Sequence, residues 1–495
     1  MEFCHTNPIL RSSAIEQLCQ FVQEWQKQWE TSTPDFERFE HELHEKIMTV
    51  ECEMLTEELA RYDVDAEQIE VGGVIHRPTL TSSETYLSAA GPISVERHLY
   101  RPAGRGSRSI CPLELRAGIM RGYWTPRAVR QAAFVMAHLT PGDSQDLFGE
   151  LGGMKPARAS LDRLPKELSA HWEVHRPEWE AALRIWEAVP SEATVIAISV
   201  DGVTVRMKSG DRSAKREQPG KHASGPTGQR EAGCGTVALY DVEGSRLQTV
   251  RYGRMPERRK GTLQQQLETE TASILAIRPD LKRVLLADGA KPNWHLLSEI
   301  DQACGPAAQP SVEIVDFYHA CDHLKEGCDA AWGESTPRSK AEFERLKILL
   351  KEDDQGADRV IRVLRYHYGR AHKRKRERLK IQLTYFRNQR DRMHYAQYLR
   401  EGLPIASGVI EATCKTLVTQ RLKQSGMAWT ITGGQAILTL RSLIQSHRWQ
   451  PAWNLLRSDF QKSVTVYNSQ TTLPAANHRT IDHLDYVALP LAICS

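Results

Sequence analysis

Three carboxylates stand at positions where a folded chain rarely leaves an acid without a partner. Asp201 lies in the apolar run IAISVDGVTV, and a buried carboxylate is costly unless it is paired or binds a metal. Asp288 follows the apolar run VLLA, and ligands of α/β sheets bind at the carboxyl ends of parallel strands. Glu411 lies in the first turn of a helix that we expect Ser407 to open, where the helix dipole favours an ionised carboxylate.

These three acids together have the ligand chemistry of a two-metal site. Carboxylates that converge on one sheet edge can hold two divalent cations about 4 Å apart. One cation activates water or a 3′-hydroxyl, and the other stabilises the leaving oxygen of a phosphodiester. Ligation by carboxylates alone selects Mg²⁺ or Mn²⁺ over zinc. Each acid also has an ordinary explanation by itself, because Asp-Gly is a common turn dipeptide and a first-turn glutamate complements the helix dipole.

An α/β segment over residues 192–320 must position the first two acids. Its first three strands follow one another directly, as hairpins do, whereas the later two need helical crossovers. A polar loop over residues 208–231 separates the first two strands, and such a length is typical of a functional or disordered segment. We expect strands at 195–207, 235–242, 247–254, 284–287 and 312–317, and helices at 263–276 and 292–303.

Residues 320–400 read as entirely helical, and a last helix is expected over 407–423. Within this region, residues 361–400 hold 13 basic and 2 acidic side chains, a net charge of +11. That density favours a phosphate-binding surface with aromatic platforms over a merely solvated helix face. The cations that we expect to bind DNA are Lys373, Arg374, Lys375, Arg376 and Arg378, with Tyr366, Tyr368, Tyr385 and Phe386 interleaved.

The first half of the chain has a different character. Residues 11–70 read as helical, and residues 31–70 hold 13 acidic and 3 basic side chains. A hairpin is expected within residues 80–125, around a Gly-Pro turn. Three helices follow over residues 126–168, and a helix carrying Arg158 and Arg163 after a glycine turn fits a helix-turn-helix DNA reader. Any small three-helix bundle would show the same pattern.

Composition excludes several classes of protein. The 495 residues are 40% apolar, which is too apolar for a disordered chain, and no apolar run approaches the roughly 20 residues of a membrane span. The ten cysteines include no C-x-x-C pair, which argues against a disulfide framework and a zinc ribbon. No secretory signal is evident at the N-terminus, so we expect a cytoplasmic protein without a membrane partner.

Four motifs in order, SVDGV, LLADGA, DFYHA and SGVIEATCK, resemble those of bacterial insertion-sequence transposases of the ISKra group, which are relatives of the Mutator-like transposases. The resemblance covers about residues 195–455 and extends more loosely upstream to about residue 80. It implies an RNase H-like catalytic core with an all-helical insertion, and it assigns the DDE triad to Asp201, Asp288 and Glu411. Asp316, which we place on a strand, and His319 match a D-x-x-H element and are expected to position ligands or substrate.

The resemblance also implies what the protein would act on. Two Mg²⁺ or Mn²⁺ ions would serve cleavage and strand transfer of double-stranded DNA, at terminal inverted repeats and at a target. A homo-oligomer, at least a dimer, and a place at the bacterial nucleoid are expected on the same grounds. The expected domains are an acidic helical region at 1–80, a DNA-binding domain at 81–190, the core at 191–320 and 403–458, the basic helical insertion at 321–402 and a tail at 459–495.

Two other functions compete with this interpretation. A transposase-derived DNA-binding protein without activity would keep the basic helices but would not need the three acids. A metal-dependent phosphohydrolase of small substrates would need the acids but not the net charge of +11 over residues 361–400.

Overall fold

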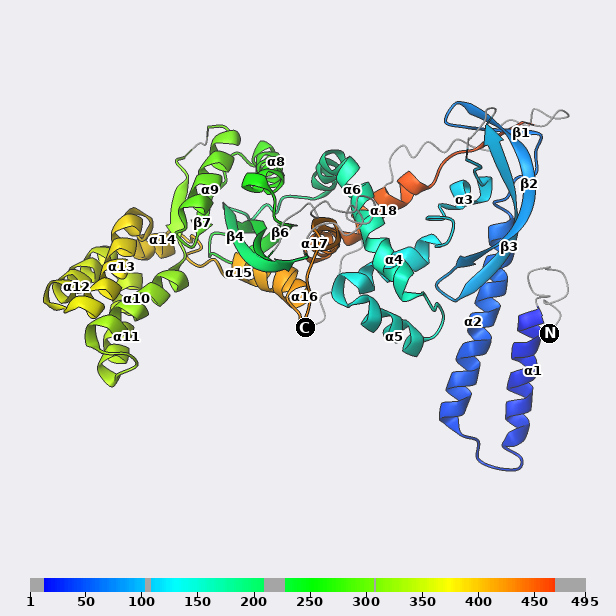
Figure 1. Ribbon diagram of the computed structural model, residues 1–495, viewed down its shortest axis with the longest axis horizontal. Helices are drawn as coiled ribbons and strands as arrows, with labels where there is room; N and C mark the ends of the chain where they lie inside the picture. Colours follow the sequence, from blue (N-terminus) through cyan, green and yellow to red (C-terminus); the bar gives the residue numbers. More distant parts are fainter. Residues whose placement is uncertain (1–12, 103–107, 209–227, 307–308, 468–495) are drawn as a thin grey trace, which may run out of the picture. The chain divides into compact units, whose positions relative to one another are not determined.

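The computed structural model describes residues 13–102, 108–208, 228–306 and 309–467, which form a mixed α/β protein with two sheets. The chain divides into two compact units (Figure 1). The first unit holds residues 1–129, 148–155 and 457–495, and the second holds residues 130–147 and 156–456. These units do not follow the expected domain boundaries, because residues 156–190 belong with the core. None of the described helices has the length and apolar character of a membrane span.

The first unit begins with two of the expected helices, α1 (Ser13–Gln28) and α2 (Phe36–Ala60). The expectation of helix up to residue 70 is wrong, because residues 68–71 form a strand. Asp35 caps α2, since its side chain accepts a hydrogen bond from the backbone N–H of Glu37. The two helices pack through Phe21, Trp25 and Phe39, whose ring centroids lie 5.1–5.9 Å apart. Aromatic contacts therefore join the two helices into a hairpin.

A four-stranded antiparallel sheet completes the first unit, in the order β3-β2-β1-β9. The expected hairpin is present as β2 and β3, and α3 (Pro112–Ala117) packs against β3. The expected irregular tail from residue 459 is wrong at its start, because Val466 pairs with Ile69 in the sheet. Residues 468–495 lie outside the described part of the chain. The strands are β1 (Gln68–Val71), β2 (Val74–Leu87), β3 (Pro92–Pro102) and β9 (Thr465–Tyr467).

The second unit is built on a five-stranded sheet in the order β6-β5-β4-β7-β8. Strands β4, β5 and β6 are antiparallel neighbours, whereas β7 and β8 run parallel to β4, so the expected strand sequence is confirmed. Residues 228–231 belong to β5 and not to the expected loop, whose residues 209–227 lie outside the described ranges. The strands are β4 (Val195–Met207), β5 (Gly228–Tyr240), β6 (Arg246–Arg254), β7 (Lys282–Ala287) and β8 (Val312–Val315).

Helices cover both faces of this sheet. A Cβ atom at Gly235 would meet Leu267 of α8 (Gly261–Ile277), and α9 (Lys291–Ala303) packs beside α8. A Cβ atom at Gly253 would meet Leu417, so the other face is covered by the segment around that residue and by α17 (Ile431–Gln445). The expected helix over 407–423 is present as α15 (Gly408–Thr413), a π-helical turn (Cys414–Thr419) and α16 (Gln420–Leu422).

The expected all-helical insertion lies between β8 and α15. Its buried leucines and Phe386 belong to the same hydrophobic core as the sheet. The insertion is therefore an extension of the core rather than a separate domain. It consists of α10 (Phe317–Trp332), α11 (Pro337–Glu352), α12 (Gly356–Arg370), α13 (Lys373–Gln389) and α14 (Tyr395–Arg400). A short 3₁₀ turn, Arg390–Arg392, follows α13, and another, Arg258–Lys260, precedes α8.

The three helices expected over residues 126–168 are present as α4 (Pro126–His138), α5 (Pro141–Leu151) and α6 (Arg158–Trp186). The third is much longer than expected and contains Pro165 and Pro177. It packs against α17, and its leucines, Trp172 and Trp179 are buried. This helix is therefore largely committed to packing the core of the second unit. The last helix is α18 (Trp449–Phe460).

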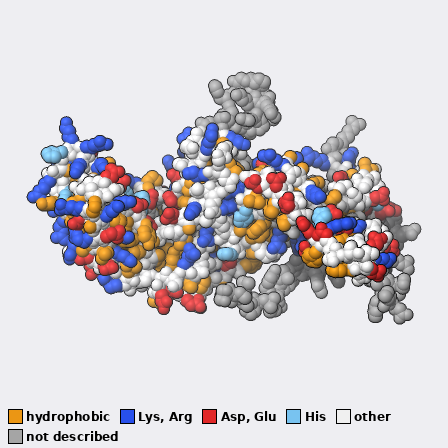
Figure 2. All heavy atoms as spheres, turned by 90° about the horizontal axis from the view of Figure 1, so that it is seen from below, with side chains coloured by type: hydrophobic (Ala, Val, Ile, Leu, Met, Phe, Trp, Pro, Cys, Tyr) orange, Lys and Arg blue, Asp and Glu red, His pale blue; other side chains and the backbone are white. Residues whose placement is uncertain are grey.

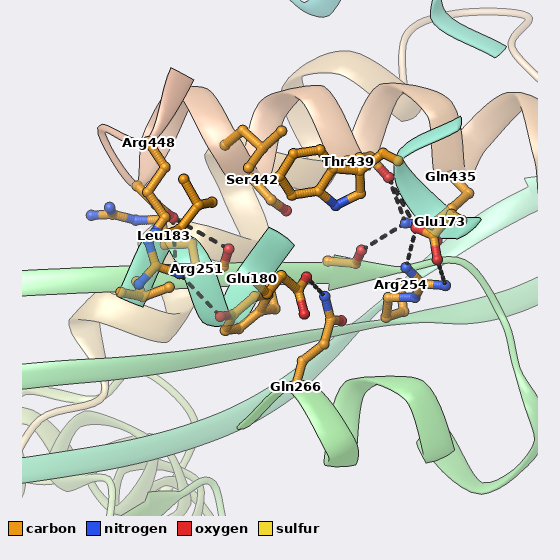
Figure 3. A pocket seen from close by; sticks show the side chains of 16 residues that line it. Glu173, Glu180, Leu183, Arg251, Arg254, Gln266, Gln435, Thr439, Ser442 and Arg448 are labelled. Atoms are coloured by element: carbon orange, nitrogen blue, oxygen red, sulfur yellow. Dashed lines mark hydrogen bonds and ion pairs between the residues drawn. The ribbon is translucent and has the colours of Figure 1, made fainter. Parts of the chain in front are cut away.

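Figure 3 shows the buried polar network that joins α6, α17 and α8 to β6. The Glu270 carboxylate accepts hydrogen bonds from Arg184, Arg448 and Tyr252, at 2.8–3.0 Å. Arg254 donates two hydrogen bonds to Glu173, at 2.6 and 3.1 Å. A cavity of about 20 Å³ lies among these groups, which is room for one water. Paired charges therefore hold the helices on the edge strand of the sheet.

Glu180 faces this cavity, and its ion-pair contact with Arg176 is long. Its Oε1 accepts a hydrogen bond from Gln266 at 2.6 Å, while the nearest guanidinium contact, from Arg176 to Oε2, is 3.7 Å long. Burial disfavours the charged carboxylate and raises the pKa of Glu180 to about 7.

Replacing Glu180 with Gln should therefore change stability in a pH-dependent way. In the folded wild type Glu180 keeps its proton up to about pH 7, whereas in the unfolded chain it loses the proton near its ordinary pKa of 4.5. The free energy of unfolding of the wild type therefore falls as the pH rises from 4.5 to about 7. Over that window the variant should gain about 3 kcal/mol relative to wild type. Urea unfolding at pH 5 and pH 8 measures the difference. Glu178→Gln, an exposed control on the same helix, should follow the wild type, and a pH-independent Glu180→Gln difference would contradict the assignment.

Candidate active site

Asp201 and Asp288 lie side by side on neighbouring parallel strands. Ser199 of β4 pairs with Leu286 of β7, and two residues further along each strand come the two aspartates. Adjacent strands are about 5 Å apart, so the two carboxylates share one edge of the sheet. On its other side Asp201 pairs with Cys234 of β5. The pairing of β4 with β7 thus brings the first two acids to one edge of the sheet.

The Asp201 carboxylate is half-buried and close to a second negative charge. Its Oδ1 accepts a hydrogen bond from the backbone N–H of Gly202 at 2.7 Å, and its Oδ2 accepts one from the Cys414 thiol at 3.5 Å. Burial raises the pKa of Asp201, and the charge of Asp288 raises it further. The two carboxylates therefore repel each other, and a cation between them would relieve that repulsion.

Asp288 is held in a tight turn at the start of α9. Its Oδ1 accepts hydrogen bonds from the Ala290 backbone N–H at 3.0 Å and from Asn293 Nδ2 at 3.2 Å. Gly289 follows with a φ of +102°, which favours glycine, and a Cβ atom there would lie 3.0 Å from the Tyr385 ring. Within the described residues, no hydrogen bond occupies Asp288 Oδ2.

Glu411 comes from the helical segment that follows the insertion. It lies on α15, which packs against β4 and β5, and its side chain is exposed. Glu411 is three residues before Cys414, so both side chains lie on one face of the helical segment. Glu411 is therefore one helical turn from the thiol that contacts Asp201.

Asp316 joins the start of α15 to the sheet. It follows β8 as the N-cap of α10, so its expected placement on a strand is wrong by one residue. Its Oδ1 accepts a hydrogen bond from the His319 backbone N–H at 2.6 Å, and its Oδ2 accepts one from the Ser407 backbone N–H. The Asp316 backbone N–H donates to Ala287 O at 2.9 Å, next to Asp288. The buried Asp316 therefore fixes the N-terminus of the helix that carries Glu411.

The His319 ring contacts other rings and not the aspartate pair. It lies edge-on to His323, with centroids 5.0 Å apart, and His323 stacks on Tyr385 at 3.6 Å. The Tyr385 hydroxyl donates a hydrogen bond to the backbone oxygen of Asp288 at 3.3 Å. Tyr385 comes from α13, so the helical insertion contacts the turn that holds Asp288.

Several groups at the site were not expected from the sequence. Lys260, with a φ of +54°, binds Glu231 at 2.8 Å and Asn293 at 3.3 Å, and its charge lowers the pKa of Asp201. A Cβ atom at Gly202 would lie 2.3 Å from the Glu231 carboxyl carbon. The Asp-Gly dipeptide signals this close approach, but no local pattern marks Lys260. Cys414 could have been found from the sequence, because it lies three residues after Glu411 and therefore on the same face of a helix.

The expected DNA-binding cations of α13 lie at the start of that helix. Figure 2 shows Lys and Arg side chains gathered at the end of the molecule that carries α12 and α13. Lys373, Arg374 and Lys375 have no ion pair among the described residues, whereas Arg378 lies 3.7 Å from Glu334 and Arg376 stacks on Tyr368 at 4.8 Å.

The four interleaved aromatic residues do not form a set of platforms. Phe386 is buried in the core, and Tyr385 packs at the acid site. Tyr366 is 57% exposed, but Arg370 lies 3.7 Å from its ring centroid. The expectation that these aromatic residues form stacking platforms for bases is therefore wrong for two of the four, because their rings fill interior space.

Arg158 and Arg163, the expected groups of a DNA reader, are both exposed near the start of α6. Arg163 donates a hydrogen bond to the backbone oxygen of Ala159 at 3.1 Å. Arg158 lines a cavity that it shares with Lys166 and Lys208. Neither arginine belongs to the acid cluster.

The sequence matches no protein-family model, and no curated protein matches it. Among solved structures, the Drosophila P element transposase strand transfer complex resembles the chain with a TM-score of 0.27 and 11% sequence identity. The match covers 70% of this chain and 84% of that chain. A TM-score of this size does not establish a common fold.

The Asp316 clamp predicts a large loss of stability on substitution. Asp316→Ala leaves two backbone N–H groups without an acceptor and removes a helix cap, which should lower the free energy of unfolding by about 2 to 4 kcal/mol. Asp322→Ala, an exposed position on the same helix, is the matched control and should change it by less than about 0.5 kcal/mol. Equal values for the two variants in urea titrations would show that Asp316 is not a clamp.

Proposed function

We propose that this protein is a DDE transposase of the ISKra group, which cleaves DNA at element ends and joins the freed 3′-hydroxyl to target DNA. The proposal rests on the positions of Asp201, Asp288 and Glu411 in the fold. Asp201 lies on β4, Asp288 follows the neighbouring parallel strand β7, and Glu411 lies one helical turn from the thiol that contacts Asp201. Proteins that bind a pair of hard cations need carboxylates in this kind of arrangement.

The residues fit the divalent cations that the resemblance implies. All three groups are carboxylates, Asp288 Oδ2 has no donor among the described residues, and the charge of Asp288 raises the pKa of Asp201. Asp201, Asp288 and Glu411 would therefore hold the metal ions. Two bound Mg²⁺ or Mn²⁺ ions would activate the attacking oxygen and stabilise the leaving oxygen.

The surrounding residues would keep the ligands in place. The Gly202 N–H, Asn293 and the Cys414 thiol bond the two aspartates and restrict their rotation. Asp316 would set the position of Glu411 through the start of α15. Gly202 leaves space for Glu231, whose charge is neutralised by Lys260. These contacts pre-order the site before substrate binds.

The rest of the proposal concerns fold and partners. Three antiparallel strands followed by two parallel ones support an RNase H-like core, with α10–α14 as its insertion. The cations at the start of α13 would contact phosphates of flanking or target DNA, and the region 81–190 would read terminal inverted repeats. The resemblance also supports a dimer or larger assembly, acting at the nucleoid in the bacterial cytoplasm.

Substituting the triad tests the chemistry. Asp201→Asn, Asp288→Asn or Glu411→Gln should each reduce cleavage of a DNA duplex with element ends below detection, because each removes a ligand charge from a site that needs all three. Binding of the duplex should survive. Asp280→Asn, at an exposed carboxylate in the same unit, should cleave as wild type does.

The same assay tests the metal. Mg²⁺ or Mn²⁺ should support cleavage, and Ca²⁺ should permit binding with little reaction, because its looser coordination places the nucleophile poorly. Undiminished cleavage in EDTA would overturn the metal assignment, and near-normal cleavage by one triad variant would remove that residue from the site.

The basic start of α13 predicts a change in salt dependence. Replacing Lys373, Arg374, Lys375 and Arg376 with Gln should flatten the slope of log affinity against log salt by about 3 to 4, because each phosphate contact contributes about −0.9. The loss should be similar on element ends and on random duplex, since phosphate contacts do not specify sequence. Fluorescence anisotropy at four salt concentrations measures the slopes.

The control for this variant removes the same charge from paired positions. Arg345, Arg359, Arg390 and Arg400 of the insertion each form an ion pair with a carboxylate at 2.6–2.9 Å. Their replacement with Gln should leave the slope within about one unit of wild type. Equal slopes for all three proteins would place the DNA-binding surface elsewhere.

A further inference from the structure

A cavity of about 450 Å³ lies in the second unit, away from the acid cluster. Its walls come from the starts of α5 and α6, the residue after β4, and the segment that leads into α17. Lys208, on this wall, follows the strand that carries Asp201, and seven residues of strand span about 23 Å. The cavity is therefore separate from the proposed metal site but connected to it by one rigid strand.

Arg421 is the feature of this cavity that needs an explanation. The residue is only 2% exposed, and yet it forms no ion pair with a carboxylate of the described residues. Its Nη1 contacts the Met427 sulfur at 3.9 Å, its guanidinium lies 5.4 Å from the centre of the Trp429 ring, and its Nε is buried without a hydrogen bond. A thioether and a ring are weak substitutes for an anion.

The neighbouring Arg441 shows what a structural arginine looks like in the same core. Arg441 is also buried, but it donates to three backbone oxygens, those of Leu417, Ala137 and Thr416. Arg421 has no backbone oxygen acceptor among the described residues. Burial and the charge of Arg441 lower the pKa of Arg421 to about 10. The charge of Asp143 partly offsets this lowering, but the Asp143 carboxylate accepts its hydrogen bond from Thr140.

Three more cations lie on the wall of the cavity. Arg158, Lys166 and Lys208 line the cavity beside Arg421. Among the described residues, the one carboxylate that lines it is Asp162, which Lys166 neutralises at 2.5 Å. A buried guanidinium at the bottom and exposed cations around it form an arrangement that binds a phosphate group, since arginine donors match its oxygens.

We propose that this cavity is a phosphate-binding site with Arg421 as its anchor, and that its ligand is a backbone phosphate of the DNA on which the protein acts. The binding site rests on the geometry alone, whereas the identity of the ligand as DNA rests on the proposed function. A phosphate held here would fix the strand about 23 Å along β4 from Asp201, several nucleotides from the scissile bond. A free phosphate compound is the other source of the same chemistry.

The full-length protein tests the site with inorganic phosphate as the probe. At pH 7.5 and constant ionic strength, set with chloride, phosphate should raise the melting temperature of the wild type. Arg421→Met should bind phosphate at least about tenfold more weakly, because charge-assisted hydrogen bonds are lost. Without phosphate, this variant should melt at or above the wild-type temperature, since it removes an unpaired buried charge. If Arg421 only stabilised the fold, the variant would melt below the wild type.

Two further variants separate folding from binding. Lys208→Gln alters the wall without touching the buried core and should weaken phosphate binding by a smaller factor. Lys423→Gln removes one exposed charge from the segment just after Arg421, outside the cavity, and should bind phosphate as wild type does. No effect of phosphate on the wild type, or equal effects in wild type and Arg421→Met, overturns the site.

A duplex-binding arm identifies the source of the phosphate. Affinity for a DNA duplex should fall several-fold more in Arg421→Met than in Lys423→Gln, and inorganic phosphate should compete with the duplex in the wild type only. If phosphate binds but DNA affinity is unchanged, the ligand is a free phosphate compound and the DNA assignment fails. If cleavage fails in the wild type while phosphate still binds through Arg421, the proposed function fails and the site stands.

Discussion

The constraint on which the site depends is the parallel pairing of β4 with β7. That pairing brings two aspartates, far apart in the sequence, to the same level on adjacent strands. Two carboxylates so close and partly buried raise the free energy of the folded chain unless something positive joins them. Lys260 supplies part of that charge, but its ammonium also binds Glu231 and Asn293. A divalent cation would supply the rest.

A second set of contacts connects this pair of strands to the insertion and to α15. Asp316 connects the end of β7, the start of α10 and the start of α15, so the sheet, the insertion and the helix of Glu411 meet at one buried carboxylate. Tyr385 then connects α13 to the Asp288 turn. The helix with the most concentrated positive charge is thus in direct contact with the acid site. DNA held on α13 would lie against the same structure that holds the proposed metal ligands.

Much of the second unit could be predicted because its signals are local. Apolar runs, an Asp-Gly turn and amphipathic spacing define its strands and helices, and the resemblance of four motifs proposes the three acids. The length of α6 could not be predicted, because prolines normally end a helix, and here the burial of Leu164, Leu168 and Trp172 outweighs Pro165. The strand β9 and the Asp316 clamp depend on partners distant in sequence, which periodicity cannot reveal. Lys260 adopts a φ of +54° that its residue type does not favour.

The most direct test of the central claim is metal-directed cleavage of the protein itself. Fe²⁺ replaces Mg²⁺ in carboxylate sites, and with ascorbate and peroxide it cuts the backbone next to the ion. Peptide mapping of the treated full-length protein should find cuts close to residues 201, 288 and 411, and excess Mg²⁺ should suppress all three together. Cuts at other positions only, or cuts at these positions that Mg²⁺ does not suppress, would contradict a shared metal site on these acids.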